Sequence, residues 1–408
     1  MEFKIIVLAF VLLSSFYSIV LNLLRYRSAK NPTPESVRDV YDEETYAKWK
    51  KYSAEHCRVD MISTAVSTLV SLSLLITNAY AAFASLFPEN MHLQLLAVIL
   101  LDTVVSVLVG VGFSYVKTMV IEEKYGFNRS TLKTFLFDQI RGLIVALLLS
   151  VGLSELMTLL SINGLLILVF GVVFFAASML ISLLYPYLSR IGNKFTPLED
   201  GELKERLLEM LSKHGYHVKA IEVMDASRRT TKLNAYIAGL GKTKTIVLYD
   251  NMIEKMTTDE ICAIFAHEMG HGLHKDVLKG QLMSIGYIAL LSAVVYFTVY
   301  EPRFYTQFGF REVNFGFAYL LTGVGLGVIQ PLTSLIMNAR SRAAEYAADR
   351  QAVIEGYGEP MITAFKKLAK DNFANLSPSK INVVHEYSHP PISDRVDAVR
   401  ALMNQNQS

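Results

Sequence analysis

The sequence is poor in charged residues, and this shortage is the first constraint on its class. Only 19% of the 408 residues are Asp, Glu, Lys or Arg, whereas about a quarter is usual in a soluble protein. Hydrophobic residues make up 52%, and the mean hydropathy is +0.33. This balance argues against an ordinary soluble enzyme and favours a protein that crosses a membrane several times.

The low net charge and the small number of cysteines exclude two further classes of function. The net charge is only +2 and the chain has no Lys/Arg-rich run or RNA-binding motif, so we expect no nucleic-acid partner. The two cysteines, Cys57 and Cys262, do not form a Cys-x-x-Cys pair. That excludes a thiolate zinc site, and we expect two inert, buried thiols rather than a disulfide.

Long apolar runs are what the sequence has instead. About 20 apolar residues are needed to cross the hydrocarbon core of a membrane, and seven runs are long enough. The first run lacks a strongly basic front and a small-x-small cleavage site, so we expect an uncleaved span rather than a signal peptide. A turn at 161–164 separates the fourth run from the fifth. The predicted spans are 3–24, 61–87, 94–120, 142–162, 164–186, 281–300 and 316–337.

Basic residues in the connecting segments predict the orientation of these spans. Eight Lys or Arg residues lie in 25–60 and four in 121–141, whereas none lies in 88–93 or 161–164. Because short cytoplasmic loops are enriched in Lys and Arg, we expect the N-terminus outside and the C-terminus in the cytoplasm. The polar segment 187–280 then also faces the cytoplasm.

Two acidic residues, Asp102 and Glu155, lie within predicted spans. A carboxylate in lipid is energetically costly, and two interpretations stay open. Either these residues face a wet interior, or they lie near span ends and pair with a neighbouring helix.

Two polar segments flank the last pair of spans. The first has helical spacing over 200–213 and strand-like runs in VKAIEVMDAS and KTIVLYD, with a third strand and a turn at 239–241 expected in TTKLNAYIAGLGKTK. The second segment begins as a helix. The expected divisions are five spans in 1–186 with cytoplasmic loops 25–60 and 121–141, an α+β part in 187–280, spans six and seven in 281–337, and a second cytoplasmic part in 338–408.

The stretch AIFAHEMGHG, residues 263–272, contains a His-Glu-x-x-His motif on a predicted helix. Thr257 and Glu260 fit a capping box at the start of that helix. His267 and His271 are four residues apart, so both imidazoles project from one face toward one ion. Glu268 lies beside them, where it can take a proton from metal-bound water. The motif therefore predicts a zinc site.

A catalytic zinc usually takes three protein ligands and leaves a fourth position for water. The third ligand must lie on the same side of the membrane, and after two spans the chain returns there with NARSRAAEYAADRQAV. Glu345 and Asp349 are again four residues apart on a helix. One can bind zinc while the other supports the site, and spacing alone leaves open which does which.

The segment EYSHPPISDR offers two more candidate site residues, His389 and Arg395. The Pro-Pro that follows the histidine makes a stiff loop, and both side chains could donate to the oxyanion of a tetrahedral intermediate. The alternative is an ordinary loop histidine and a surface arginine.

At this point the motifs carry a family resemblance. HEMGH, then SRAAEYAAD after two spans, then YSHPP resemble the integral-membrane CAAX prenyl protease family of zinc metallopeptidases. Further matches in the same order are YDEETYAKWKKYS, IEEKYGFNRST, NKFTPLEDGEL and LNAYIAGLGKTKTIVLYD, so the resemblance runs along nearly the whole chain.

The resemblance implies roles for individual residues. Glu345 would be the third ligand of one zinc ion and Asp349 would support it. The partners implied are a peptide or lipidated protein substrate and membrane lipid, and nothing in the sequence indicates an oligomeric state. The residues implied to contact substrate are Asn234, Ala235 and Tyr236 along its backbone, and His389 and Arg395 beside the scissile bond.

The implied fold class is an α-helical polytopic membrane protein. Seven long helices would enclose a large chamber, which a cytoplasmic zinc domain closes. The sequence departs from the family at Met269, where Leu is frequent, and at Gly272, where an aromatic residue is frequent. Its Gln-Asn-Gln-Ser end shows no retrieval signal for the endoplasmic reticulum. This absence, in a compact chain without long insertions, favours a bacterial or archaeal member and its inner membrane over the endoplasmic reticulum.

The expected function is hydrolysis of a peptide bond near the C-terminus of a prenylated CAAX-type substrate, or a prokaryotic equivalent, with Glu268 as general base. One alternative is a membrane-protein quality-control zinc protease, although related proteases of that kind have fewer spans. The other is a non-proteolytic chaperone or lipid carrier with a structural zinc. Glu268 argues against that alternative, because a structural site has no use for a base.

Overall fold

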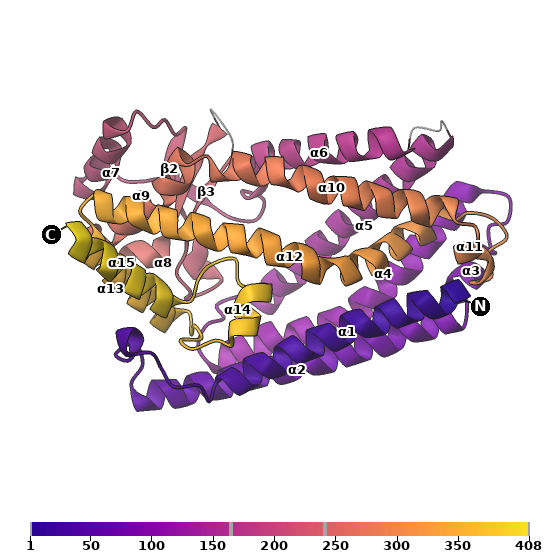
Figure 1. The fold of residues 1–408 in the computed structure, drawn as a ribbon, viewed down its shortest axis with the longest axis horizontal. Helices are drawn as coiled ribbons and strands as arrows, with labels where there is room; N and C mark the ends of the chain where they lie inside the picture. Colours follow the sequence, from indigo (N-terminus) through magenta and orange to yellow (C-terminus); the bar gives the residue numbers. More distant parts are fainter. Residues whose placement is uncertain (1, 163–165, 240–242, 407–408) are drawn as a thin grey trace.

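A computed structural model describes residues 2–162, 166–239 and 243–406, so the predicted turns at 161–164 and 239–241 lie partly outside the described residues. The fold is mostly helical (Figure 1). The helices are α1 (Glu2–Ser28), α2 (Glu43–Ile76), α3 (Ala79–Ala84), α4 (Met91–Tyr115), α5 (Leu132–Ile162), α6 (Leu166–Leu188), α7 (Glu202–Lys213), α8 (Asp250–Lys255), α9 (Thr258–Leu273), α10 (Asp276–Tyr300), α11 (Arg303–Thr306), α12 (Phe315–Ile354), α13 (Gly358–Asp371), α14 (Lys380–Glu386) and α15 (Ile392–Asn406). Short turns of other helix types are η1 (Glu35–Val37), η2 (Val116–Glu122), which continues α4, and η3 (Ala226–Arg228).

Seven helices in the described part of the chain are long and apolar enough to cross a membrane, as the sequence predicts. They are α1, α2, α4 with η2, α5, α6, α10 and α12. Several begin before the apolar run that predicts them, because a helix continues into polar surroundings once its backbone hydrogen bonds are formed. Helix α12, with 40 residues, is about 60 Å long at 1.5 Å per residue, roughly twice the thickness of the hydrocarbon core.

The second span is where the prediction is wrong. The sequence predicts one span over 61–87, but α2 runs over Glu43–Ile76 and the separate helix α3 follows. The break lies at Asn78, whose φ of 56° is left-handed. The residues on both sides of Asn78 are apolar, so hydropathy shows no break here. The helix nevertheless ends, because a residue in the left-handed conformation cannot continue a right-handed helix.

Helix α12 joins two parts that the sequence separates. The predicted boundary between span seven and the second cytoplasmic part, at 337, lies inside this one helix, which also passes through Pro331. One end of α12 buries Phe317 among the membrane helices, and the other end carries Glu345 and Asp349. A single rigid element therefore connects the far end of the membrane region to the predicted metal site.

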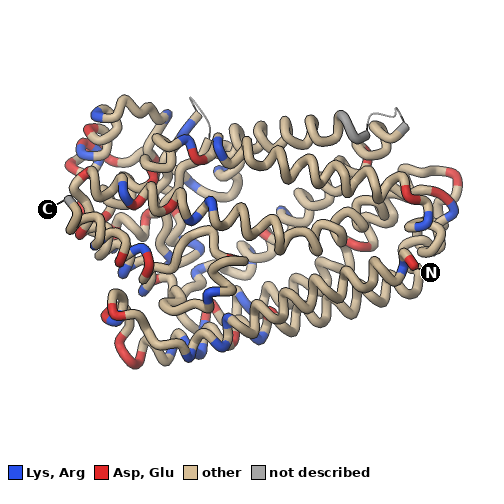
Figure 2. Tube along the Cα trace, in the orientation of Figure 1, with Lys and Arg blue, Asp and Glu red and all other residues tan. Residues whose placement is uncertain are grey.

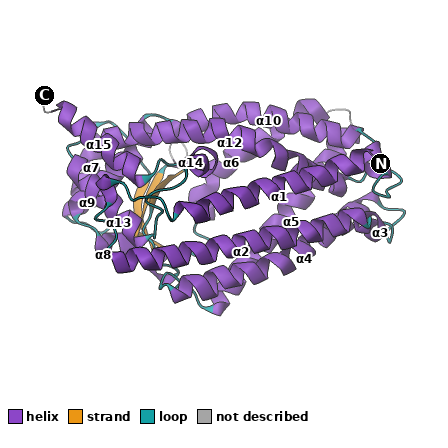
Figure 3. Ribbon diagram, turned by 60° about the horizontal axis from the view of Figure 1, so that its bottom comes forward, coloured by secondary structure: helices purple, strands orange, loops and turns teal. Residues whose placement is uncertain are grey.

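A small sheet lies at the end of the molecule where α9 and α13 pack (Figure 3). Its strand order is β1 (Phe195–Pro197), β2 (Ala220–Met224), β4 (Thr245–Tyr249) and β3 (Ala235–Ala238). Strands β2 and β4 are parallel and the other pairs are antiparallel. Three of these strands are predicted, whereas the three-residue β1 is too short to show a pattern. Strand β3 lies at the edge of the sheet and packs against α9.

Buried side chains gather in two clusters, one at each end of the long helices. The first surrounds α9 and includes Trp49, Ile246 and Phe265. The second, at the opposite end, includes Tyr305 and Phe317. Between the clusters few side chains of the spans are buried by the protein itself. Figure 2 shows the charged residues concentrated at the two ends, with few between them.

The two acidic residues inside the spans have partners. Asp102 accepts a hydrogen bond of 2.7 Å from the Tyr80 hydroxyl and also lines a cavity of about 360 Å³ together with Ser106. Glu155 lies 2.8 Å from the ring of His92. Pairing with a neighbouring helix therefore applies to both residues, and for Asp102 the cavity applies as well. Both cysteines are buried and free, as expected.

Candidate metal centre

The start of α9 is held by reciprocal hydrogen bonds. The Thr257 hydroxyl accepts from the Glu260 backbone N–H at 3.3 Å, and the Glu260 carboxylate accepts from the Thr257 N–H at 2.8 Å. The same carboxylate binds the Lys367 ammonium of α13 at 2.6 Å. The predicted capping box is confirmed. Because it fixes where the helix begins, it also fixes which face carries His267 and His271.

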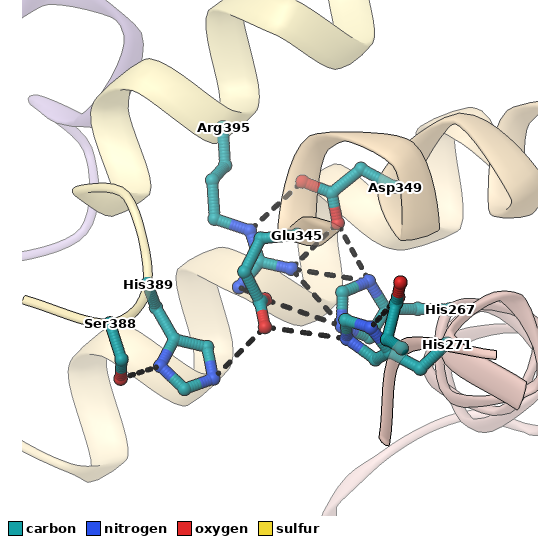
Figure 4. Close-up of polar contacts among 8 residues, drawn as sticks. His267, His271, Glu345, Asp349, Ser388, His389 and Arg395 are labelled. Carbon is teal, nitrogen blue, oxygen red and sulfur yellow. Dashed lines mark hydrogen bonds and ion pairs between the residues drawn. The ribbon is translucent and has the colours of Figure 1, made fainter. Parts of the chain in front are cut away.

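Three predicted ligands come together from α9 and α12 (Figure 4). The Nε2 atoms of His267 and His271 are 3.2 Å apart. Glu345 reaches both, with Oε2 at 3.4 Å from His267 Nε2 and Oε1 at 3.3 Å from His271 Nε2. The candidate ligand atoms all lie within 4.8 Å of one another.

The residues present fit a divalent metal. The Glu345 Oε2 atom is buried and accepts no hydrogen bond from the described residues, although the Arg395 guanidinium lies 3.2 Å away. The Nε2 atoms of His267 and His271 lie 3.2 Å apart beside the Glu345 carboxylate, and once deprotonated they offer lone pairs to a cation. Two histidine nitrogens and one carboxylate are a common donor set of catalytic zinc, which keeps a fourth position open.

Each histidine is oriented by a second carboxylate on its other ring nitrogen. His267 Nδ1 lies 2.8 Å from Asp349 Oδ1, and His271 Nδ1 lies 3.0 Å from Asp276 Oδ2. Such contacts hold the ring so that Nε2 points at the metal position. Spacing alone does not say whether Glu345 or Asp349 is the third ligand. In the structure the Glu345 carboxylate points at the Nε2 atoms of both histidines.

Asp276 is a site residue that the sequence analysis misses. It is the first residue of α10 and follows Lys275, whose left-handed φ of 56° turns the chain sharply after α9. The only signal in the sequence is an acidic residue five positions after His271, and nothing in that spacing indicates the turn that brings the carboxylate back.

Arg395 lies beside the carboxylates of Asp349 and Glu345. Its Nε and Nη2 atoms donate to Asp349 at 2.9 and 2.6 Å, and Nη1 lies 3.2 Å from Glu345 Oε2. The side chain is buried and stacks on Phe365. Its Nε and Nη2 donors serve Asp349, and the role as an oxyanion donor beside the scissile bond stays a prediction. Its contacts are those of a residue that holds the ligands in place.

His389 lies on the open side of the centre. Its Nε2 is 3.2 Å from Glu345 Oε1, and its Nδ1 is 2.9 Å from the Ser388 hydroxyl. The residue is exposed, so its ring can turn toward a bound ligand. The structure thus brings this ring next to the candidate ligand Glu345, and its role as an oxyanion donor stays a prediction.

The surroundings raise the pKa values of Glu268, His267 and His271, for different reasons. Burial raises the pKa of the Glu268 carboxyl above its usual value. Burial alone would lower the pKa of His267, but the carboxylates of Asp349 and Glu345 raise it to about 9. The pKa of His271 is raised as well, because Glu345 and Asp276 outweigh burial. In the metal-free protein both ligand imidazoles therefore tend to hold protons.

The predicted substrate-contact residues lie along the edge strand. Ala235 and Tyr236 belong to β3, and Asn234 precedes it with an exposed side chain. The Asn234 carbonyl accepts from the Tyr249 N–H at 3.2 Å, and β3 pairs with β4 on one side. No strand pairs with its other side within the described residues.

Comparison with known proteins relates this centre to peptidases. The profile of peptidase family M48 matches residues 197–403, which include every ligand described above. A second profile, described as CAAX prenyl protease N-terminal, five membrane helices, matches residues 22–190. Membership of this family implies a bound metal.

Individual relatives align along almost the full length. A CAAX prenyl protease 1 homolog of Oryza sativa is 29% identical and covers 96% of each chain. CAAX prenyl protease 1 of Saccharomyces cerevisiae is 26% identical and covers 97% of this chain and 95% of its own. The crystal structure of S. mikatae Ste24p matches with a TM-score of 0.90 at 26% identity, covering 98% of this chain and 99% of that one. The chain belongs to peptidase family M48 and is an integral-membrane metalloendopeptidase.

Proposed function

We propose that the chain binds one zinc ion through His267, His271 and Glu345 and hydrolyses a peptide bond near the C-terminus of prenylated CAAX-type substrates. The observation that carries the proposal is the ligand group beside an unpaired strand edge, in a chain similar along its length to CAAX prenyl proteases. We also propose that 187–280 and 338–408 form one enzyme domain, into which α10 and α12 lead.

The metal would supply Lewis acidity that polarises the scissile carbonyl and acidifies water. Glu268 takes the proton of the attacking water and passes it to the leaving amine. Its raised pKa suits both transfers. Asp349 and Asp276 keep the Nε2 atoms of the two histidines aimed at the metal position.

His389 donates to the oxyanion of the tetrahedral intermediate from the open side of the centre. Arg395 neutralises Glu345 and Asp349 and keeps them in position. The substrate backbone adds to the free edge of β3 near 234–237, a mode of binding that reads main chain rather than sequence.

We propose that the metal centre faces the cytoplasm and that the N-terminus lies outside. The support is the distribution of Lys and Arg, with eight in 25–60 and none in 88–93. In the structure α2 brings that basic segment to the end where α9 lies (Figure 2).

The test is cleavage of a farnesylated CAAX peptide by purified protein in detergent, beside the same peptide without its lipid. Removal of the last three residues, lost on chelation and restored by zinc, is the expected result. Glu268→Gln should keep its zinc and lose about 10²–10⁴-fold in rate. Cleavage by this variant at the wild-type rate would exclude the mechanism. If neither peptide is cut while zinc is bound, a quality-control protease with other substrates becomes the better reading.

A further inference from the structure

A basic pocket of about 430 Å³ lies at the sheet end of the membrane helices α5 and α6. Its walls come from the first turns of α5, from the loop between α6 and β1, and from η3 with the residue that follows it. No residue of the metal centre lines it, and no lining residue is acidic. The basic lining residues are Lys133, Lys194, Arg228 and Arg229, and Phe137 and Gly192 lie among them.

The two arginines form one wall of this pocket. Arg228 and Arg229 each donate an Nη2 hydrogen to the Gly192 carbonyl, at 2.7 and 2.9 Å. Arg229 also pairs with Asp138 of α5. Gly192 has a left-handed φ of 85°, and a Cβ atom there would lie 3.3 Å from Arg229 Nη2. The guanidinium groups thus pack against the loop backbone and hold a positively charged wall in place.

The two lysines add charge that the protein does not balance. Lys133 and Lys194 are exposed, and neither forms an ion pair within the described ranges 2–162, 166–239 and 243–406. Asp225 and Asp138 pair with the arginines instead. Positive charge is therefore in excess, and the complementary ligand is an anion. A phosphate group offers more oxygens to several separate cations than a carboxylate does.

An apolar stripe on α5 begins at the pocket. Phe137, Ile140, Ile144 and Leu148 are all exposed, and their spacing from Lys133 places them on one face of the helix. Lys133 and Ile144 are eleven residues apart, about 17 Å along the helix, which is roughly the depth of one membrane leaflet. A ligand with an anionic head and an apolar tail would match the pocket and the stripe together.

We propose that this pocket binds the phosphate of an anionic membrane phospholipid, whose acyl chains lie along the stripe Phe137, Ile140, Ile144 and Leu148. Basic pockets beside membrane helices on the cytoplasmic side are suited to such headgroups, and anionic lipids give the cytoplasmic leaflet its negative surface potential. The proposed orientation places the pocket in that leaflet. Free phosphate would use the same cations but would gain nothing from the stripe.

The lipid would also join two parts of the fold. Its phosphate would contact α5 through Lys133, the loop before β1 through Lys194, and the segment after η3 through Arg229. The backbone of this segment is already attached to the membrane region, since the Arg129 N–H donates to the Arg229 carbonyl at 3.0 Å. A bound headgroup should therefore stabilise the contact between the membrane helices and the sheet.

The first test measures lipid retention by native mass spectrometry of the purified protein in detergent. Phosphatidylglycerol should bind at one site at least about tenfold more tightly than phosphatidylcholine with the same acyl chains. The double variant Lys133→Gln, Lys194→Gln should lose about tenfold or more of that affinity. It should fold normally, because neither lysine forms an ion pair, whereas replacing Arg228 or Arg229 would also disturb the loop at Gly192.

The matched control is the double variant Lys51→Gln, Lys380→Gln. These two lysines are exposed on α2 and α14 and do not line the pocket, so the control changes the net charge equally and should retain phosphatidylglycerol like the wild type. Equal retention of the two lipids by the wild type would overturn the proposal. Equal loss in both double variants would do so as well, because it would show an effect of net charge alone.

The second test is thermal unfolding with added lipid. Phosphatidylglycerol should raise the melting temperature of the wild type and of the control variant, since a ligand of the folded state stabilises it, and should leave the Lys133→Gln, Lys194→Gln variant unchanged. Inorganic phosphate at the same concentration should neither raise the midpoint nor displace the lipid. If it does both, the pocket is a site for free phosphate and the assignment to a lipid is wrong. Neither test uses a peptide, so both outcomes are independent of the proposed protease activity.

Discussion

At the scale of single residues, the carboxylates of Asp349 and Asp276 hold the imidazoles of the two proposed metal ligands. Asp349 lies four residues after Glu345 and was a candidate from its spacing, whereas Asp276 is recognised only from its 3.0 Å contact with His271 Nδ1. Both carboxylates contact Nδ1, the ring nitrogen that does not point toward the proposed metal position. Their effect should therefore appear in metal affinity as well as in turnover.

Replacing Asp276 by Ala should weaken zinc binding by about 10–100-fold, because His271 loses the contact that fixes its tautomer and ring angle. Competition with a chromophoric chelator measures this, and the absorption spectrum of the Co²⁺ form reports ligand geometry. Asp276→Asn, which keeps an acceptor oxygen, should fall between. Asp397→Ala, at an exposed position on α15, is the control, and equal affinity in all three variants would contradict the role.

Metal binding should also depend on pH through the same histidines. In the metal-free protein the pKa of His267 is raised to about 9, so below that pH a metal must displace a proton. Apparent zinc affinity should then rise about tenfold per pH unit between 7 and 9, and more steeply if His271 also loses a proton. Calorimetry in buffers of different ionisation enthalpy counts the protons released. An affinity that stays constant over this range would be inconsistent with the assignment.

At the scale of elements, α9 and α12 build the centre together. Helix α9 places two ligands on one face because the capping box fixes its first turn. Helix α12 adds Glu345. This helix has 40 residues and begins at the far side of the membrane region. The ligand geometry therefore depends on how two helices cross, which no local pattern encodes.

Thr257→Ala should lower the melting temperature, since loss of a cap hydrogen bond costs about 1 kcal/mol. The Glu260 backbone N–H would lose its acceptor while Glu260 kept its contact with Lys367. Thr257→Ser retains the hydroxyl and should behave like the wild type. Thermal unfolding of the zinc-loaded protein distinguishes them, and indistinguishable midpoints for all three proteins would show that the cap is not needed.

At the scale of the whole molecule, the two buried clusters leave the middle of the spans unpacked. If these helices enclose a wet chamber, side chains on their inner faces should meet water although they lie at membrane depth. Ser106 lines the cavity that contains Asp102, whereas Leu108, two residues along α4, is 73% exposed on another face.

Ser106→Cys in liposomes should react with a membrane-impermeant thiol reagent, and Leu108→Cys should not. A thiol reacts as the thiolate, which forms in water and not in lipid. Cys57 and Cys262 are buried, so background labelling should be low. Protection of both new cysteines would argue for a tight bundle without a chamber.

The sequence by itself determined the class, the number of spans, the capped helix and the His-Glu-x-x-His pair. These features depend on composition, on run length and on contacts between residues three or four apart, all of which are local. It missed one break, because hydropathy does not register the left-handed turn at Asn78.

Tertiary structure decided the rest. Whether Glu345 or Asp349 faces the metal position, that Asp276 folds back on His271, that Arg395 lies beside these carboxylates and that Tyr216 occupies the space above Gly272 are all outcomes of helix crossing and chain reversal. The packing of whole helices and strands determines which residues far apart in the sequence come into contact. No pattern in a single chain states that packing.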